Sequence, residues 1–315
     1  IDITFFQNSF RKRSWLNILN ITCVKTLFSL EKTVAIRGIA ITLIIFSHVI
    51  GCLGVRYATP LGGIGVAIFL ILSGYGLKES YDKKGLSFFW KNKFLNVYIP
   101  YLIVELLLFF RFGDFDILSL LLLKPRVSYF WYLNFLLVNY LIFFVLYLKS
   151  WHKYDNFILL IISCLFFFYC GELRAEQCFS FTLGVFLSKY KYRFQRYINK
   201  CTIFYCFLIG FIALYIKQIE WCRTGNYYVF IFMQVLNKIP LGLSIMFLSI
   251  FFKKYTLWSY IGKYSYELYL THVLFIPILI VDLSLSSILI YIIFFISSAF
   301  FIFRIKKDII SLIKY

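Results

Sequence analysis

Residues 33–51 read TVAIRGIAITLIIFSHVIG, a run that is long and apolar enough to cross a lipid bilayer as one helix. It is the first of ten apolar runs, which charged or Gly- and Pro-containing loops separate. Within a few residues, the runs occupy 33–54, 63–77, 97–112, 130–148, 157–171, 176–188, 201–217, 228–252, 264–281 and 284–304. The pattern predicts an all-α polytopic membrane helix bundle of about ten transmembrane helices. The eighth run contains Asn237, Lys238 and Pro240, which predicts a kink or a break there.

The composition of the chain excludes a water-soluble globular protein. Of its 315 residues, 62% are hydrophobic and 15% are charged, and the mean hydropathy is +0.83. Ten spans with short loops use up this length and leave no room for an additional soluble domain. We therefore expect an N-terminal cytoplasmic extension over 1–32, a transmembrane domain over 33–304 and a cytoplasmic C-terminal tail over 305–315.

The distribution of basic residues predicts the orientation of the chain in the membrane. The sequence has 33 Lys and Arg against 14 Asp and Glu, a formal net charge of +19. Numbering the loops alternately places 24 of the 33 basic residues on the side that holds both termini and seven on the other side, with Arg37 and Lys238 inside spans. Cytoplasmic loops carry the excess of Lys and Arg, so both termini are expected in the cytoplasm. Basic residues spread over six separate segments do not indicate a partner nucleic acid.

Arg37 and His48 are the two ionisable residues of the first span, and such residues indicate function by default. Eleven residues of helix return to nearly the same face and separate the two side chains by about 16 Å. The pair is suited to hold the charged end of an elongated anionic donor at Arg37 while His48 acts as a base near its other end. The structural alternative is that Arg37 extends to the interface and His48 caps the helix.

Two further clusters of polar residues lie near spans two and three. Ser73, Gly74 and Tyr75 end the apolar part of the second span, where small residues permit close helix packing or a kink, and Ser73 lacks the sequence context of a nucleophile. Lys93 precedes Tyr98 at the start of the third span, where the lysine either contacts phosphates arriving from the cytoplasm or only fixes the topology.

The ninth span carries a third cluster, in which Tyr266, Tyr269 and His272 lie among other tyrosines. Tyr269 and His272 are three residues apart and share a helix face, so they are expected to line a cavity, or else His272 forms a hydrogen bond across the bundle. The sequence predicts no metal site, since it has no Cys/His cluster at metal-ligand spacing.

Five blocks of sequence in the same order resemble the acyltransferase-3 family of integral membrane acyltransferases, which modify bacterial surface polysaccharides and related glycans. The blocks are Arg37-Gly38-Ile39-Ala40 with His48; Gly65-Val66, Phe69 and Ser73-Gly74-Tyr75; Tyr98 with Pro100-Tyr101; Phe130-Trp131-Tyr132-Leu133; and Gly262, Ser265-Tyr266, Tyr269-Leu270 and His272. The chain departs from the family at Lys93-Phe94-Leu95-Asn96, where a second cation is missing, and at Ala67, where an acidic residue is frequent.

The resemblance implies a set of roles for these residues. His48 would be the catalytic histidine with Arg37 as its partner, Lys93 and Tyr98 would bind the acyl donor, and a surrounding group would support them. That group comprises Ser73, Gly74, Tyr75, Trp131, Tyr266, Tyr269 and His272. The family takes an acyl group, usually from acetyl-CoA as a co-substrate with no bound cofactor, and delivers it to a sugar hydroxyl at or beyond the bacterial cytoplasmic membrane.

The sequence therefore predicts an O-acyltransferase, with acyl-CoA and a cell-surface or capsular glycan, or its lipid-linked precursor, as substrates. A transporter or flippase of a lipid-linked glycan is the alternative, because intramembrane polar residues also line translocation paths. A non-catalytic subunit of a polysaccharide-synthesis complex is a third, in which His48 would tolerate substitution.

Overall fold

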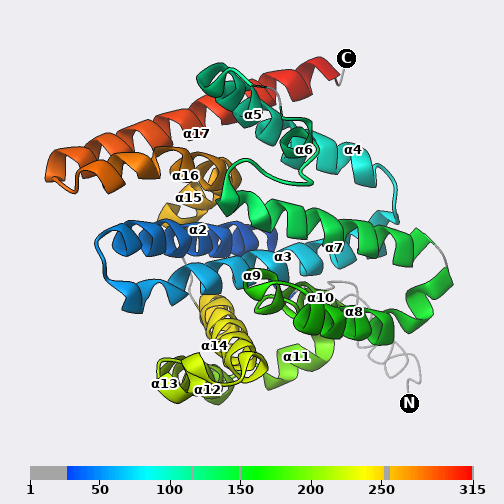
Figure 1. Ribbon diagram of the computed structural model, residues 1–315. Coiled ribbons are helices and arrows are strands. Elements are labelled where there is room, and N and C mark those ends of the chain that lie inside the picture. Colours follow the sequence, from blue (N-terminus) through cyan, green and yellow to red (C-terminus); the bar gives the residue numbers. More distant parts are fainter. Residues whose placement is uncertain (1–26, 115, 149, 252–255, 314–315) are drawn as a thin grey trace, which may run out of the picture.

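The computed structural model describes residues 27–114, 116–148, 150–251 and 256–313, and every regular element in these ranges is a helix (Figure 1). The all-α prediction is confirmed for this part of the chain. The predicted extension over 1–32 lies almost wholly outside the described residues. The final helix, α17 (Leu285–Ile313), runs through most of the segment predicted as a tail, so this part continues the last predicted span without a break.

Six helical segments are long and apolar enough to cross a membrane. They are α2 (Leu30–Cys52); α3 (Pro60–Lys84); Phe89–Phe112, made of α4 (Phe89–Lys93), the π-helical turn η2 (Phe94–Tyr98) and α5 (Ile99–Phe112); Ser128–Leu148, made of η3 (Ser128–Phe130) and α7 (Trp131–Leu148); Tyr227–Phe251, made of α14 (Tyr227–Leu248) and η5 (Ser249–Phe251); and α17. Two bent pairs raise the number of candidate spans to eight. They are α11 (Lys191–Tyr197) with α12 (Lys200–Ile216), at 92°, and α15 (Thr256–Lys263) with α16 (Ser265–Val281), at 69°.

The predicted count of ten spans is not confirmed, although each of the ten predicted stretches contains a helix. Two of these helices, α8 (Asp155–Tyr169) and α10 (Ser180–Lys189), have 15 and 10 residues, whereas a crossing takes about 20. The other short elements are η1 (Arg56–Ala58), α6 (Ile117–Leu120), η4 (Ser150–Tyr154), α9 (Glu172–Ala175) and α13 (Glu220–Thr224). The cytoplasmic location of the termini stays a prediction.

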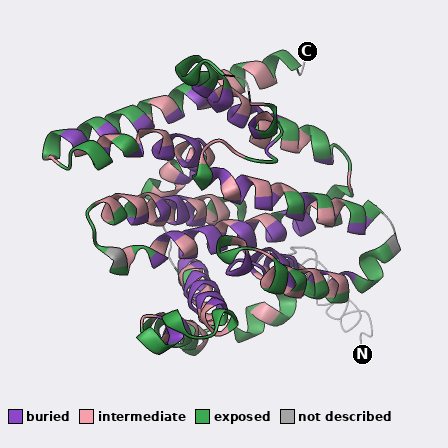
Figure 2. Cartoon of the chain, in the orientation of Figure 1, coloured by how far each residue is buried: buried purple, intermediate pink, exposed green. Residues whose placement is uncertain are grey.

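Helix α3 lies at the centre of the bundle and packs against α2, α10 and α14. Figure 2 shows α3 mostly buried, with exposed residues concentrated on peripheral helices such as α12 and α17. The α3–α10 crossing depends on two glycines, because a Cβ on Gly74 would meet the carbonyl oxygen of Phe181, and one on Gly184 that of Ile71. Gly74 therefore serves close packing, as the structural alternative for this position predicted.

A second close crossing fixes α2 against α15. A Cβ on Gly38 would meet the carbonyl oxygen of Trp258, and one on Gly262 would meet that of Val34. Small residues at such contacts let two backbones approach each other closely. Because Gly38 follows Arg37 directly, this crossing also holds the segment of α2 that carries Arg37 against α15.

The outer surface of the bundle is apolar in a way that suits lipid. On α12, Phe207 and Phe211 are about half exposed, and on α17 Ile293 is 61% exposed. Contiguous exposure of large apolar side chains is rare in water-soluble monomers. Together with the apolar helices, this surface supports a multi-pass membrane protein.

Helix α14 continues past Pro240 as one helix, so the predicted break in this span is absent. Asn237 and Lys238, which precede the proline, are 0% and 4% exposed. The charge of Lys238 is therefore buried within the bundle, and the side chain that it contacts belongs to the candidate site described next.

Candidate active site

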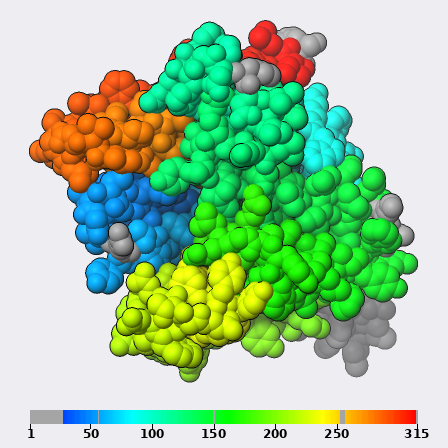
Figure 3. Space-filling model, in the orientation of Figure 1, coloured from blue at the N-terminus to red at the C-terminus, as the bar shows by residue number. Residues whose placement is uncertain are grey.

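Two separate cavities lie along α2, one near each of the ionisable residues of that helix. The His48 cavity has a volume of about 540 Å³ and the Arg37 cavity about 260 Å³. The two cavities have no lining residue in common. Figure 3 shows the C-terminal half of α2 and the loop after it (blue) between α16 and α17 (orange) and α12–α14 (yellow). The sequence placed Arg37 and His48 on one helix face, and the structure gives each its own chamber.

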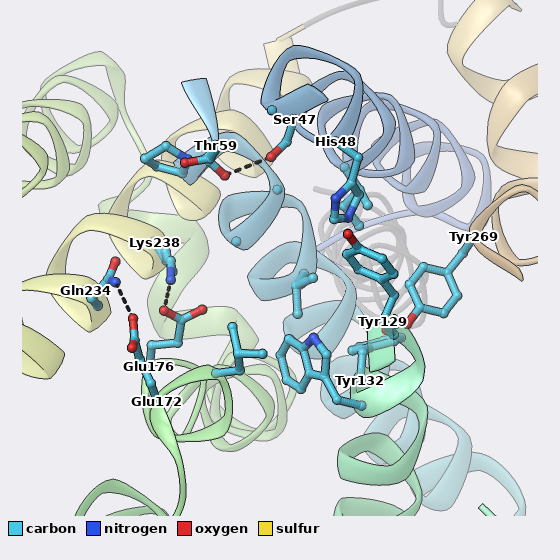
Figure 4. A pocket seen from close by; sticks show the side chains of 18 of the residues that line it. Ser47, His48, Thr59, Tyr129, Tyr132, Glu172, Glu176, Gln234, Lys238 and Tyr269 are labelled. Atoms are coloured by element: carbon cyan, nitrogen blue, oxygen red, sulfur yellow. Dashed lines mark hydrogen bonds and ion pairs between the residues drawn. The ribbon is translucent and has the colours of Figure 1, made fainter. Parts of the chain in front are cut away.

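His48 is half-buried near the end of α2, where its ring borders the larger cavity (Figure 4). The ring of Tyr129 packs edge-on against it, with the ring centroids 4.8 Å apart and the planes at 80°. The neighbouring Ser47 hydroxyl donates a 2.8 Å hydrogen bond to the carbonyl oxygen of Thr59, which ties the end of α2 to the start of α3. These contacts hold the imidazole at the edge of the cavity.

His272 of α16 lies behind His48, with 5.4 Å between the ring centroids. It is fully buried, and its Nδ1 lies 3.0 Å from the carbonyl oxygen of Leu268. A carbonyl oxygen only accepts hydrogen bonds, so we assign the proton to Nδ1, which makes Nε2 an acceptor. Nε2 has no hydrogen-bond partner among the described residues. An unpaired buried acceptor next to a second imidazole indicates a functional role.

Aromatic residues from α7 and α16 complete this side of the cavity. The Tyr269 hydroxyl donates a 2.6 Å hydrogen bond to the carbonyl oxygen of Tyr129, which fixes the tyrosine that packs on His48. The ring of Tyr269 meets that of Tyr132 at 5.3 Å, and Trp131 lines the same cavity. The predicted cavity-lining role of Tyr269 agrees with this placement.

Across the cavity from His48 is a set of charged and amide side chains that we call the polar wall (Figure 4). It contains an ion pair between Lys238 and Glu176 and a hydrogen-bonded chain in which Lys217 donates to Gln234 at 2.8 Å and Gln234 donates to Glu172 at 3.3 Å. All of these except Glu172 are buried. The polar wall was missed as a site, although the charge of Lys238 within an apolar run was the signal that could have found it.

Lys217 follows α12 directly, and its environment disfavours the charged form of its amine. Burial, and secondly the nearby ammonium group of Lys238, lower the pKa of Lys217 from 10.5 to about 8, against the opposing effect of Glu176 and Glu172. The ammonium form is consequently less favourable here than on an exposed lysine.

The Arg37 cavity is basic. Arg37, Lys84 and Lys93 line it together with Ser73 and Asn92, and among the described residues that line it there is no carboxylate. The ammonium group of Lys93 lies 4.2 Å from the centre of the Tyr140 ring, which borders the same cavity. Such a lining favours an anion.

Tyr132 stands between the two chambers. Its ring lines the His48 cavity, whereas its hydroxyl is hydrogen-bonded with Ser73 and lies close enough to Arg37 to interact with its charge. The hydrogen bond between Tyr132 and Ser73 therefore links a residue of one cavity to a residue of the other.

Besides Gly74 at the α3–α10 crossing and His272 beside His48, three predicted site residues line neither cavity. The Tyr98 hydroxyl donates to the carbonyl oxygen of Leu120 at 2.8 Å, and the Tyr266 hydroxyl donates to that of Val97 at 2.7 Å. Tyr75 is buried, and its hydroxyl accepts a hydrogen bond from the backbone N–H of Phe28 at 3.4 Å. In the structure these three tyrosines hold elements together.

Comparison with known proteins identifies the family. A family model described as an acyltransferase domain, acyltransferase-3, matches residues 35–306, nearly the whole chain. No curated protein and no solved structure matches it. The matched region contains His48, Arg37 and every lining residue of the two cavities. The match gives no support to a transporter, and the chain belongs to the acyltransferase-3 family of membrane acyltransferases.

Proposed function

We propose that the protein transfers an acyl group, acetyl in the first instance, from cytoplasmic acyl-CoA to a sugar hydroxyl. The acceptor would be a cell-surface or capsular polysaccharide, or its lipid-linked precursor, at a bacterial cytoplasmic membrane. Acyl-CoA is a co-substrate in this proposal, and no bound cofactor is needed.

The observation that carries the proposal is the position of His48 at a large cavity with the unpaired Nε2 of His272 beside it. A general base needs one nitrogen free for the substrate and a partner that orients its other nitrogen. In this proposal the Nε2 of His272 accepts the N–H of His48 during the reaction and so directs the second nitrogen of His48 at the cavity. His272 is a positioning residue in this arrangement, and His48 is the catalytic base.

The chemical step balances with His48 alone as the proton carrier. His48 takes the proton of the acceptor hydroxyl as the oxygen attacks the thioester carbonyl carbon. The carbon–sulfur bond then breaks, the new ester leaves with the sugar, and the CoA thiolate takes the proton back from the imidazolium. Histidine suits this exchange because its ordinary pKa lies near neutral pH.

The Arg37 cavity supplies a site for the acyl donor. Three cationic side chains without a lining carboxylate match the phosphate groups of CoA. The orientation predicted from the distribution of Lys and Arg would put this cavity on the cytoplasmic side, where acyl-CoA is found. The thioester end would reach His48 past Tyr132 and Ser73, the residues that lie between the cavities.

Transfer of label from acetyl-labelled acetyl-CoA to endogenous glycan tests the proposal in membranes that carry the wild type, His48→Ala or His152→Ala. His152, in η4, borders neither cavity. We expect transfer by the wild type and by His152→Ala and none by His48→Ala at equal insertion. Normal glycan acylation by the His48→Ala variant would refute the assignment.

The same membranes test the two alternatives. Export of a lipid-linked glycan without acyl transfer would favour the flippase. If neither the wild type nor the His48→Ala variant transfers label, and the variant still supports normal glycan production, the non-catalytic subunit would be favoured.

A further inference from the structure

The polar wall contains charged side chains that are buried inside the bundle, where an unpaired charge is energetically unfavourable. Lys238 and Glu176 are each 4% exposed, and Lys238 lies in the middle of a membrane-length helix. Charges in such positions are expensive to bury and mark functional sites by default. The structure also makes room for the lysine, because a Cβ on Gly63 would collide with its side chain.

The polar wall borders the same cavity as His48. Its five side chains and His48 line one cavity, and Figure 4 shows the Lys238–Glu176 pair and the Gln234–Glu172 pair on the side opposite the imidazole. A volume of about 540 Å³ lies within the range of about 300–1,000 Å³ that is usual for small-molecule sites. A molecule bound against the wall would therefore present its other side to His48.

The charges of the wall indicate the class of molecule. Two carboxylates, at Glu172 and Glu176, balance the two ammonium groups of Lys217 and Lys238. A phosphate or diphosphate would need an excess of cations, which the Arg37 cavity has and this wall lacks. Alternating acceptors and donors match a ring with several hydroxyl groups, since each hydroxyl both donates and accepts. Trp131 on the same cavity adds an aromatic surface for the apolar face of such a ring.

We propose that Glu172, Glu176, Lys217, Gln234 and Lys238 bind the sugar ring of the acceptor by its hydroxyl groups and leave one hydroxyl free for His48. This inference rests on the proposed acyl transfer and adds the residues that select the acceptor. Glu172 contributes most directly, because it is exposed, lines the cavity, and has Gln234 as its only hydrogen-bond partner among the described side chains.

The test uses the full-length protein in lipid nanodiscs with labelled acetyl-CoA. The acceptor is the cell-envelope glycan fraction of the source cells after mild alkaline removal of its esters. Two variants alter the polar wall. One is Glu172→Ala, at an exposed position, and the other is the double variant Glu176→Gln with Lys238→Met. The double variant removes both charges of the buried pair, so neither is left uncompensated. Glu220→Ala is the matched control, since Glu220 is an exposed acid that does not line the cavity.

We expect the KM for the glycan to rise about 10-fold in Glu172→Ala, the effect of losing one hydrogen bond to a charged group. The KM for acetyl-CoA should stay within about twofold, since Glu172 does not line the Arg37 cavity. The double variant should show the same pattern with a larger rise, and Glu220→Ala should match the wild type.

Three results would overturn this inference. An unchanged KM for the glycan in both wall variants, with the wild type active, refutes the sugar site and leaves the proposed function standing. Competition by inorganic pyrophosphate against the glycan, lost in the double variant, would show a phosphate site instead. Absence of transfer by the wild type refutes the proposed function itself and removes the basis of the inference.

Discussion

The imidazoles of His48 and His272 lie with their ring centroids 5.4 Å apart, one on α2 and the other on α16, although the two residues are 224 positions apart in the chain. The two residues come from different blocks of sequence, and the packing of α16 on α2 brings them together. The Nδ1 of His272 is committed to the backbone of Leu268, so its Nε2 is the atom available to His48. In the proposed mechanism, His48 meets the substrate and His272 orients His48.

Replacing His272 by two different amides tests the orienting role. In His272→Gln the side-chain oxygen can occupy the place of Nε2, whereas in His272→Asn the amide reaches only the position of Nδ1. We expect the kcat of the His272→Asn variant to fall about 10- to 100-fold and that of the His272→Gln variant to fall less. The KM for the acyl donor should be unchanged in both. Steady-state acyl transfer measures this. Equal losses of activity and of inserted protein in the two variants would indicate a structural role only.

The two neighbouring lysines at the end of α3 test the donor cavity. Lys84 lines the Arg37 cavity and Lys83 does not, while both are exposed. Lys84→Gln should raise the KM for acetyl-CoA a few-fold, and Arg37→Ala should raise it more because the arginine is half-buried. Lys83→Gln should leave it unchanged. Titrations of acetyl-CoA at low and high salt measure both effects, and identical salt-sensitive losses for Lys83→Gln would point to the surface charge as a whole.

The pKa of Lys217 predicts a pH dependence of stability. Because its pKa is about 8 in the folded protein and 10.5 ordinarily, folding carries a cost at and below pH 8 that is relieved as the pH rises from about 8 to 10.5. Stability of the wild type should therefore rise over this window relative to Lys217→Met, by up to about 3 kcal/mol. The charged groups around it are Lys238, Glu176, Glu172 and Arg223.

Thermal unfolding monitored by fluorescence-detected size exclusion at pH 7.5, 9 and 10 gives this difference. The comparison is between wild type and variant at each pH, so titration of other groups cancels. A constant difference across the three values would show that Lys217 titrates normally.

The glycines of the Ser73–Gly76 segment test the α3–α10 crossing. A methyl group at Gly74 meets the carbonyl oxygen of Phe181, whereas one at Gly76 meets nothing within 4 Å. Gly74→Ala should destabilise the protein by about 1–3 kcal/mol or more. Gly76→Ala should be neutral or slightly stabilising, because alanine favours helix. The apparent Tm of the two variants measures this, and equal values would mean that α3 and α10 are farther apart than described.

Much of the candidate site could be predicted from local patterns. A histidine and an arginine inside an apolar run are conspicuous because the bilayer penalises them, and both lie at cavities. The block around His272 was similarly visible, and its proximity to His48 was not, because that contact depends on how α16 packs on α2. The spacing of Arg37 and His48 in the sequence predicted the distance between them along α2, but not that each of them lines a separate cavity.

The polar wall could not be predicted from the sequence, because its residues come from helices and helix ends that lie far apart in the chain. Glu172, Glu176 and Lys217 read as ordinary charged residues between apolar runs or at their ends, and only the bent path through α9 and α12 brings them to α14. The count of ten spans is not confirmed for a related reason: an apolar run of 13 to 15 residues can form a short helix that is covered by its neighbours, as α10 is by α3. Hydropathy records that a segment is apolar and not whether lipid or protein covers it.

The two cavities share no lining residue, and the hydrogen bond between Tyr132 of one and Ser73 of the other has a consequence for the energetics of the cell. An open aqueous channel through a membrane would let protons and small ions flow down the electrical gradient, which amounts to about 2.3 kcal/mol per charge for each 100 mV. Two cavities without a common lining residue, one lined by Tyr132 and the other by its hydrogen-bond partner Ser73, do not form one continuous channel of this kind. A chain built in this way can remain in an energised membrane without depleting the ion gradient on which the cell depends.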